Sequence, residues 1–332
     1  MTEKTGFKIA ILGAGPAGLQ AAQYLVERGY EVHVYDRLPE PGGMMMFAIP
    51  SRRIPKDRIR GRVRELERKG VQFILKTKIQ DGYSKIEGDD LVENIVSIRE
   101  IISKYDSILI CTGAWKSRML NIEGENSVGV YPALEYILNI RLKELGYVDR
   151  EPDVGNRVVV IGAGRTAVDV VEELCLRNRE VILIYRRKIS ESRAYREFLK
   201  LLNKYNIKVL EERQPLKILV NRGRVSGLEF CKVKREGDKF ILDTSNIETI
   251  ECDTVIEAIG EIPTPPINEN IAKELGIEIR DGRIVVDSEY RTGNEKIFAA
   301  GDVVLGPSSI GQAVGSGLKA AQSIDKYLRA KR

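Results

Sequence analysis

Hydrophobic and polar positions alternate with two different periods along residues 8–36, and their order predicts a strand, a turn, a helix and a second strand. Residues 8–12 are almost continuously apolar, as is typical of a short buried strand. The apolar positions of 17–28 recur at helical spacing. A second strand, 31–35, is followed directly by Asp36. The segment therefore predicts a βαβ unit of a parallel sheet.

A later segment, 157–187, repeats this order of strand, glycine turn, helix and strand with the same spacing. Two further stretches, 105–113 and 253–260, each read as a buried strand that runs into a turn of small residues. With 332 residues the chain exceeds the size at which one hydrophobic core usually keeps growing, so two domains are expected. The predicted fold class is α/β, with two Rossmann-like dinucleotide-binding domains of three layers each.

The turn of the first unit has the spacing Gly-x-Gly-x-x-Gly at Gly13, Gly15 and Gly18. The first glycine permits a tight turn, the second lets the backbone approach a pyrophosphate, and the third allows close packing of helix on strand. Asp36 lies about 20 residues on, where a carboxylate can accept hydrogen bonds from an adenosine ribose. The alternative, a plain glycine turn, is disfavoured by the register of strand, loop, helix and acid. This candidate site comprises Gly13, Gly15, Pro16, Ala17, Gly18, Asp36 and Arg37.

The second unit differs from the first in the residues that follow its last strand. Its turn places Gly162, Gly164 and Ala167 at the three positions, but Arg186 and Arg187 stand where an acid would hold a ribose. A carboxylate would repel a 2′-phosphate, whereas guanidinium groups pair with one, so this site should prefer NADP(H) to NAD(H). The alternative is a pair of arginines that is merely solvated at a strand end. This candidate site comprises Gly162, Gly164, Arg165, Thr166, Ala167, Arg186, Arg187, Ala258 and Gly260.

Two intervening segments leave alternatives open. Prolines and a Pro-Gly-Gly turn forbid a continuous helix after Asp36, so residues 44–49 are expected to form an apolar loop, packed on the core or on a flat cofactor ring. A helix is predicted over 56–69, and residues 51–69 hold nine basic residues against three acidic ones. That excess fits either a solvated face or a docking patch for an acidic partner.

The stretch after this helix has a weaker pattern. Residues 77–104 are expected to form short strands and turns.

Composition removes several classes of function. The four cysteines include no Cys-x-x-Cys pair, which argues against a redox dithiol and a ferredoxin-type cluster. The only histidine, His33, lies inside a predicted strand, so neither a metal site nor a catalytic triad is expected, and no catalytic residue is named.

No apolar run reaches the roughly 18 to 20 residues of a membrane span, and no signal peptide is evident, so a cytoplasmic protein is expected. Nucleic-acid binding is disfavoured. Abundant Lys, Arg, Glu and Ile hint at a thermophile.

Several longer stretches together resemble a known family. They are VYDRLPEPGGMMMFAIPSRRIPKDRIRGRVREL, ILICTGAW, VVVIGAGRTAVD, LIYRR, DTVIEAIG and FAAGDVV with GQAVGSGLKAAQSID. Over nearly its whole length the chain resembles the flavoproteins with two dinucleotide-binding domains, above all glutamate synthase small (β) subunits and the flavin subunits of ferredoxin:NADP oxidoreductases. The resemblance implies an FAD domain at 1–118 and 285–332 and an inserted NADP(H) domain at 119–284.

Roles for further residues follow from the resemblance. Gly42, Gly43 and the loop 44–49 would line the isoalloxazine, Asp302 would bind the ribityl or pyrophosphate side, and backbone near Gln312 would face the flavin. The residues implied are Gly42, Gly43, Met44, Met45, Ile49, Pro50, Thr112, Gly113, Gly301, Asp302, Gly311, Gln312 and Ala313.

The sequence departs from the family at its beginning. Glutamate synthase small subunits carry an N-terminal cysteine-rich region for iron–sulfur clusters, and this sequence starts directly at the FAD strand. We therefore expect hydride transfer between NADPH and FAD, with electrons passed to ferredoxin or to a separate iron–sulfur or large subunit. The alternatives are the small subunit of glutamate synthase or of a related multi-subunit complex, an electron-transfer or assembly module without a substrate of its own, and, less favoured, a thioredoxin reductase. The oligomeric state is left open, a homo-oligomer included.

Overall fold

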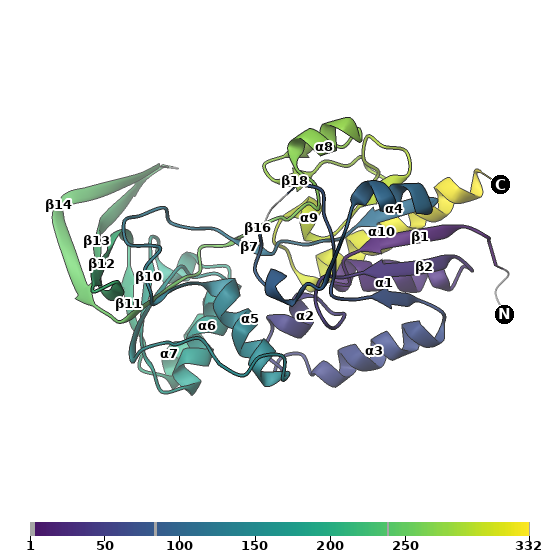
Figure 1. Ribbon diagram of the computed structural model, residues 1–332. Helices are drawn as coiled ribbons and strands as arrows, with labels where there is room; N and C mark the ends of the chain where they lie inside the picture. Colours follow the sequence, from purple (N-terminus) through teal and green to yellow (C-terminus); the bar gives the residue numbers. More distant parts are fainter. Residues whose placement is uncertain (1–3, 83–84, 238, 332) are drawn as a thin grey trace. The chain divides into compact units, whose positions relative to one another are not determined.

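A computed structural model describes residues 4–82, 85–237 and 239–331 (Figure 1). The chain packs into two compact units, the first formed by Met1–Lys116 with Glu261–Arg332 and the second by Ser117–Gly260. Each unit contains one of the two βαβ segments predicted from the hydrophobic pattern. The fold class is α/β with two Rossmann-like units, as predicted.

Of the two boundaries between the units, one lies close to its expected position and the other does not. The chain leaves the first unit after residue 116, close to the expected 118. It returns at 261, not at 285, because residues 261–284 belong to the first unit. Ile267, Ala272 and Ile277 are buried in the same cluster as core residues of the first sheet, which explains why this stretch packs there.

The first unit is built on a parallel sheet of five strands in the order β19-β6-β1-β2-β3. Ile9 and Ile11 of β1 face helices α1, α3 and α10, whereas Ala10 and Leu12 face α4 and α8, so helices cover both faces. The bounds are β1 Lys8–Leu12, β2 Glu31–Tyr35, β3 Gln72–Ile74, β6 Ser107–Ile110, β19 Ile297–Ala299, α1 Pro16–Val26, α3 Lys56–Arg68, α4 Ile98–Lys104, α8 Glu269–Glu274 and α10 Ile310–Arg329.

The second unit repeats the design with a parallel sheet in the order β11-β10-β9-β15-β8. Helices α5 and α6 cover one face. The antiparallel sheet β12-β13-β14 covers the other, where Val159 and Ile161 pack on Leu228 and Phe230. The bounds are β8 Val130–Pro132, β9 Arg157–Ile161, β10 Glu180–Tyr185, β11 Lys208–Glu211, β15 Thr254–Glu257, β12 Arg213–Asn221, β13 Arg224–Glu236, β14 Lys239–Glu251, α5 Ala133–Glu144, α6 Arg165–Leu176 and α7 Tyr195–Lys204.

Shorter elements connect these layers. They are β4 Thr77–Ile79, β5 Asn94–Val96, β7 Lys116–Ser117, β16 Glu261–Ile262, β17 Ile279–Arg280, β18 Arg283–Ile284, α2 Met44–Phe47, α9 Asp302–Leu305 and the 3-10 turns η1 Asp89–Leu91 and η2 Ile189–Glu191. Over the part of the chain that is described, no helix is both long enough and apolar enough to cross a membrane.

Two local predictions were wrong. Residues 44–47 form one turn of helix, α2, where a loop was expected. The turn fits between Gly43, which is its N-cap, and Pro50, because no proline lies within residues 44–47. Within 77–104, where short strands and turns were expected, residues 98–104 form α4. Its N-cap Ser97 accepts a hydrogen bond from the Arg99 N–H at 3.1 Å, a start signal that the sequence already carried.

Candidate functional site

The glycine loop of the first unit is packed so tightly that two of its glycines tolerate no side chain. A Cβ on Gly13 would lie 2.3 Å from the Cys111 carbonyl oxygen, and one on Gly18 would lie 2.0 Å from the Gly13 carbonyl oxygen. Gly13 also has φ of 111°, a conformation that favours glycine. The turn from β1 into α1 therefore depends on both residues, as the motif predicted.

Gly15 stands in open space instead. A Cβ there would meet nothing within 4 Å, and the residue is the N-cap of α1 without a side-chain capping bond. Pro16 follows at the first helical position, and Ala17 is buried beneath it. The uncapped N–H groups of this first turn and the helix dipole form a place where an anion can bind.

Asp36 is tied to the glycine loop. Its Oδ2 accepts the Ala14 N–H at 2.6 Å and its Oδ1 accepts the Leu38 N–H at 2.8 Å. Burial raises the pKa of Asp36 in spite of these two bonds. Each carboxylate oxygen has a further lone pair, so the residue can hold the loop and still accept a hydroxyl.

Arg37 is a buried cation with an unused donor. Its Nη1 donates to Asp89 Oδ1 at 3.2 Å, and its guanidinium carbon lies 4.9 Å from the centre of the Trp115 ring. Its Nη2 is buried and has no partner among the described residues. Burial lowers the pKa of Arg37, and Asp89 opposes that shift. A buried cationic N–H without an acceptor is a point that an anionic ligand would satisfy.

The Pro-Gly-Gly segment joins the same loop. The Gly42 N–H donates to the Ala14 carbonyl at 2.8 Å, and a Cβ on Gly43 would lie 3.0 Å from Gly15 Cα. In the segment that follows, Met46 and Phe47 of α2 are fully buried, whereas Met44 and Met45 of α2 and Ile49 beyond it are only half-buried. The apolar run is thus divided between core packing and side chains that remain accessible. Pro50, at its end, is buried.

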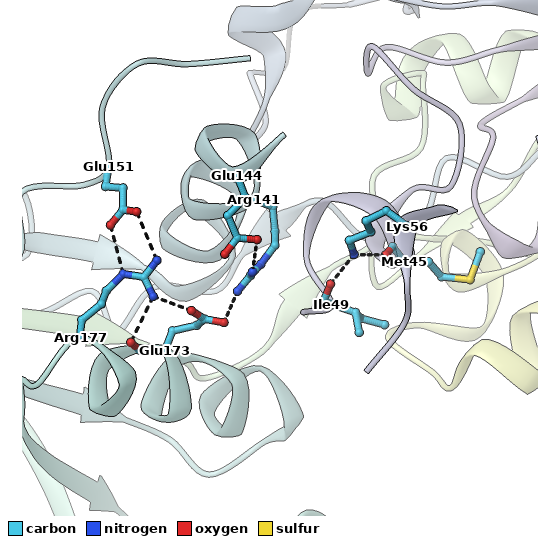
Figure 2. Close-up of polar contacts among 8 residues, drawn as sticks. All are labelled: Met45, Ile49, Lys56, Arg141, Glu144, Glu151, Glu173 and Arg177. Atoms are coloured by element: carbon cyan, nitrogen blue, oxygen red, sulfur yellow. Dashed lines mark hydrogen bonds and ion pairs between the residues drawn. The ribbon is translucent and has the colours of Figure 1, made fainter. Parts of the chain in front are cut away.

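Lys56 holds this segment in place, and the sequence analysis missed its role. Its side chain is buried, and its Nζ donates to the Met45 carbonyl at 2.6 Å and to the Ile49 carbonyl at 2.5 Å (Figure 2). Those carbonyls belong to the last turn of α2 and the residues after it, where a cation is favourable. A lysine that begins a surface helix after a proline gives no sign in the sequence that it turns inward.

We expect Lys56→Met to lower the free energy of unfolding by about 1–3 kcal/mol, because it leaves two part-buried carbonyls without their charged donor while the aliphatic stem keeps its packing. Lys69→Met is the matched control, since Lys69 pairs with Glu27 and Glu65 at the surface and its loss should cost less than about 1 kcal/mol. Urea unfolding of both variants measures the difference. Equal losses would contradict the anchoring role.

The other predicted residues of the first unit lie at the same edge of the sheet. Thr112 and Gly113 follow β6, and the Thr112 hydroxyl donates to the Thr264 carbonyl at 2.7 Å. Gly301 follows β19 and donates its N–H to Ser316 Oγ at 2.9 Å, and Asp302 accepts the Ser308 hydroxyl at 2.6 Å. Because β1, β6 and β19 are parallel neighbours, their carboxyl ends bring these residues together.

Helix α10 completes this edge from the C-terminal part of the chain. Ser309 and Gln312 form a capping box at its start, so the Gln312 side chain is used by the helix itself. Gly311 and Gln312 are exposed, and Ala313 is buried. A Cβ on Gly317 would lie 2.2 Å from the Ala17 carbonyl, which shows how closely α10 crosses α1.

The glycine loop of the second unit has the same geometry. A Cβ on Gly162 would lie 2.2 Å from the Ala258 carbonyl, while one on Gly164 would meet nothing within 4 Å. Gly164 is the N-cap of α6 and again lacks a side-chain capping bond. Arg165 is exposed, Thr166 half-buried and Ala167 fully buried. Gly260, with φ of 111°, lies after β15 at the same edge.

Arg186 and Arg187 follow β10 directly, as predicted. Arg186 is exposed and Arg187 half-buried. Neither guanidinium forms a hydrogen bond or an ion pair with any described residue, although both lie over the ring of Phe240. Phe240 is 50 residues or more away in sequence, and nothing in the local pattern links it to the arginines.

These two units, each with a glycine loop that opens a helix at the carboxyl edge of a parallel sheet, define a protein with two dinucleotide-binding domains. Residues 7–317 match the family described as pyridine nucleotide-disulphide oxidoreductase, and the chain belongs to that family. It is accordingly an oxidoreductase that uses FAD and NADPH.

Individual relatives agree with the resemblance read from the sequence. The chain is 32% identical to the NADPH glutamate synthase small chain of Escherichia coli (strain K12), over 98% of this chain and 70% of that one. It is also 32% identical to the beta subunit of the NADP(+)-dependent formate dehydrogenase of Moorella thermoacetica, over 98% of this chain, but it spans only 44% of that subunit. Similarity to glutamate synthase small chains is thereby confirmed.

Solved structures share the fold. FprA of Mycobacterium tuberculosis in complex with NADPH superposes with a TM-score of 0.74 at 19% identity, covering 98% of this chain and 85% of that one. Thioredoxin reductase of Lactococcus lactis gives a TM-score of 0.71 at 21% identity, covering 98% and 99%. At these identities the likeness concerns the fold alone.

Proposed function

We propose that this chain takes hydride from NADPH onto FAD and passes the electrons to a separate iron–sulfur protein, ferredoxin or an iron–sulfur subunit. The observation that carries the proposal is the pair of equivalent glycine loops with unlike ends. One loop is followed by Asp36, which suits a ribose hydroxyl, and the other by Arg186 and Arg187, which suit a 2′-phosphate.

The residues of the first unit fit FAD. Gly15 leaves space for a pyrophosphate at the start of α1, and the buried Nη2 of Arg37 lacks an acceptor that an anionic cofactor could supply. Asp36 would hold the adenosine ribose, and the half-buried Met44, Met45 and Ile49 would line the flavin ring. The flavin, when bound, supplies hydride acceptance and the release of electrons one at a time.

The cysteines support an electron path without thiols. All four, Cys111, Cys175, Cys231 and Cys252, are free, and burial raises the pKa of each one. Burial raises the pKa of Cys175 to about 11 and that of Cys252 to about 12, so the thiolate form is scarce at neutral pH. A thioredoxin reductase activity, which needs a reactive cysteine pair, is therefore disfavoured.

The exposed face of α3 is the surface we propose for an acidic partner. Arg62 pairs with Glu65 at 2.7 Å and Arg60 with Glu40 at 2.7 Å, which offsets their charges. Arg58 and Arg64 are exposed and have no acidic partner among the described residues, so they contribute uncompensated positive charge. Such charges accelerate association with an acidic protein.

A second function, as small subunit of a larger NADPH-dependent complex, is supported by the relatives. Several carry "small chain" or "subunit beta" in their names, among them the E. coli glutamate synthase chain. In such a complex the partner chain would perform the final reaction, and the two dinucleotide sites proposed here would act unchanged. Reduction of isolated ferredoxin distinguishes the two functions.

The test is an anaerobic titration of the FAD-loaded chain with NADPH, followed by addition of ferredoxin. We expect NADPH to bleach the flavin and NADH to do so much more slowly. A flavin that NADPH fails to bleach would refute hydride transfer. Faster bleaching by NADH would refute the assignment of the arginine pair to a 2′-phosphate.

The ferredoxin step has its own readout. We expect its rate to fall steeply as salt rises from about 0.01 M to about 1 M, since the screening length shrinks from roughly 30 Å to roughly 3 Å. Replacing Arg58 and Arg64 by Glu should slow it about tenfold at low salt. Lys273→Glu, on α8 at the opposite face of the sheet, is the control and should change little. A rate indifferent to salt and to the arginines would refute docking on α3.

A further inference from the structure

Phe240, near the start of β14, contacts the arginine pair that follows β10. The guanidinium carbon of Arg186 lies 4.8 Å from the centre of the Phe240 ring, and that of Arg187 lies 5.6 Å from it. Both distances are within the range of a cation–π interaction. One aromatic ring on β14 thus contacts two cations that follow β10, a strand of a different sheet. Figure 1 shows β10 and β14 in the same unit of the chain.

These ring contacts use none of the guanidinium N–H groups as donors to an oxygen acceptor. The N–H donors lie in the guanidinium plane, and no described residue accepts a hydrogen bond or an ion pair from either arginine. Among the described residues, nothing therefore competes with a phosphate for these donors. This differs from the other arginines near the tip, because Arg235 pairs with Glu191 at 3.2 Å and donates to the Gly237 carbonyl at 2.9 Å.

Surrounding contacts hold the adjoining ends of β13 and β14 against the segment that carries the arginines. Arg235 lies opposite Phe240 in the β13-β14 register, and its partner Glu191 belongs to η2, just after the arginine pair. The backbone is held as well, since Glu212 N–H donates to the Arg187 carbonyl at 3.3 Å and Ile189 N–H donates to Glu211 Oε1 at 2.6 Å. Two acidic side chains of this region, Glu191 and Glu211, are thus engaged by Arg235 and by backbone N–H.

We propose that Phe240 is a positioning residue for nucleotide specificity, holding Arg186 and Arg187 so that both guanidinium groups meet the 2′-phosphate of NADPH. This inference rests on the proposed function, because it assumes that the second unit binds the nicotinamide nucleotide. Long arginine side chains lose substantial rotamer entropy when they bind. A ring that restrains both of them beforehand lowers that cost, and the gain applies only to ligands with a 2′-phosphate.

The experiment is calorimetric titration of the FAD-loaded chain with adenosine 2′,5′-bisphosphate and with 5′-AMP, which differ only by the 2′-phosphate. We expect Phe240→Leu, which keeps an apolar side chain without a ring, to weaken the bisphosphate about five- to tenfold and to change 5′-AMP less than about twofold. Phe240→Tyr, which restores a ring, should recover most of the affinity.

Two reference variants separate the inference from its premise. Ile241→Ala changes the next residue of the same strand, which is 47% exposed, and should leave both affinities unchanged. The double variant Arg186→Ala with Arg187→Ala should remove most of the bisphosphate preference. If the double variant keeps that preference, the proposed nucleotide site itself is wrong.

If instead the double variant loses the preference while Phe240→Leu keeps it, the positioning role of Phe240 is refuted. The same holds if Phe240→Leu and Ile241→Ala weaken both ligands equally, because the effect is then a loosened hairpin. Thermal unfolding of each variant confirms that the second unit is folded before the affinities are compared.

Discussion

Gly15→Ala should abolish FAD binding and leave the affinity for adenosine 2′,5′-bisphosphate unchanged, while Gly164→Ala should do the opposite. Each glycine has ordinary negative φ, −73° and −79°, and an added Cβ would meet no atom within 4 Å. Alanine therefore fits the unliganded fold at both positions. The methyl group would occupy the space that a phosphate needs when it approaches the backbone. At Gly15 this is the pyrophosphate of FAD, and at Gly164 it is the 5′-phosphate, the part of a dinucleotide pyrophosphate that the bisphosphate retains.

The expected loss is about 100-fold in affinity or more, which corresponds to roughly 3 kcal/mol, the value of one or two hydrogen bonds to a charged group. Retained flavin absorbance after gel filtration measures FAD binding, and calorimetry measures the bisphosphate. Loss of the bisphosphate from Gly15→Ala and of FAD from Gly164→Ala would reverse the assignment of the two cofactors to the two units.

Gly18→Ala is the control that distinguishes a blocked site from a broken fold. Its Cβ would lie 2.0 Å from the Gly13 carbonyl oxygen, so the backbone has to move. Urea unfolding without ligand should show a clear loss of stability for Gly18→Ala and almost none for Gly15→Ala. A Gly15→Ala chain that is equally destabilised would mean that lost FAD reports folding and not the site.

Glu173→Ala should cost the second unit about 3–5 kcal/mol of unfolding free energy, a large part of the roughly 5–15 kcal/mol that stabilises a typical domain. Arg141 of α5 is 2% exposed and pairs with Glu173 of α6 and with Glu144 (Figure 2). Arg177 joins Glu173 at 2.6 Å and Glu151 at 3.1 Å. Removing Glu173 leaves a buried guanidinium without its main counter-charge.

Glu180→Ala is the matched control, because Glu180 pairs with Arg157 at 2.8 Å where both side chains are about half exposed. Its loss should cost less than about 1 kcal/mol. Replacing Arg141 and Glu173 together by Met and Leu should destabilise less than Glu173→Ala alone, since no buried charge is then unpaired. Urea unfolding of Glu173→Ala, Glu180→Ala and the double variant measures these losses of stability. A loss of under about 1 kcal/mol for Glu173→Ala would contradict a buried network.

Much of the fold follows from local patterns. The strands 8–12 and 31–35 and the end of α10 at Arg329 lie where the apolar period predicts them, because each element buries one continuous face. The position at which the chain re-enters the first unit was predicted wrongly: the structure places it at residue 261, and the prediction was residue 285. The stretch between those positions has no break in composition, and its membership depends on which core Ile267 and Ile277 enter.

The candidate sites divide in the same way. The glycine spacings, Asp36 and the arginine pair are visible in the sequence because each function needs a fixed residue type at a fixed distance along one βαβ unit. Lys56 beneath Met45 and Ile49, and Phe240 beneath Arg186 and Arg187, are not visible, since they depend on where a distant side chain points.

The sequence by itself therefore determined the two glycine loops, their unlike ends and the family, because these are encoded in short segments. Only the tertiary structure decided which residues support the loops: the buried lysine under α2, the aromatic ring under the arginine pair and the charge network between α5 and α6. The physical reason is that burial and side-chain direction arise from contacts between segments far apart in the chain, and no local period encodes them.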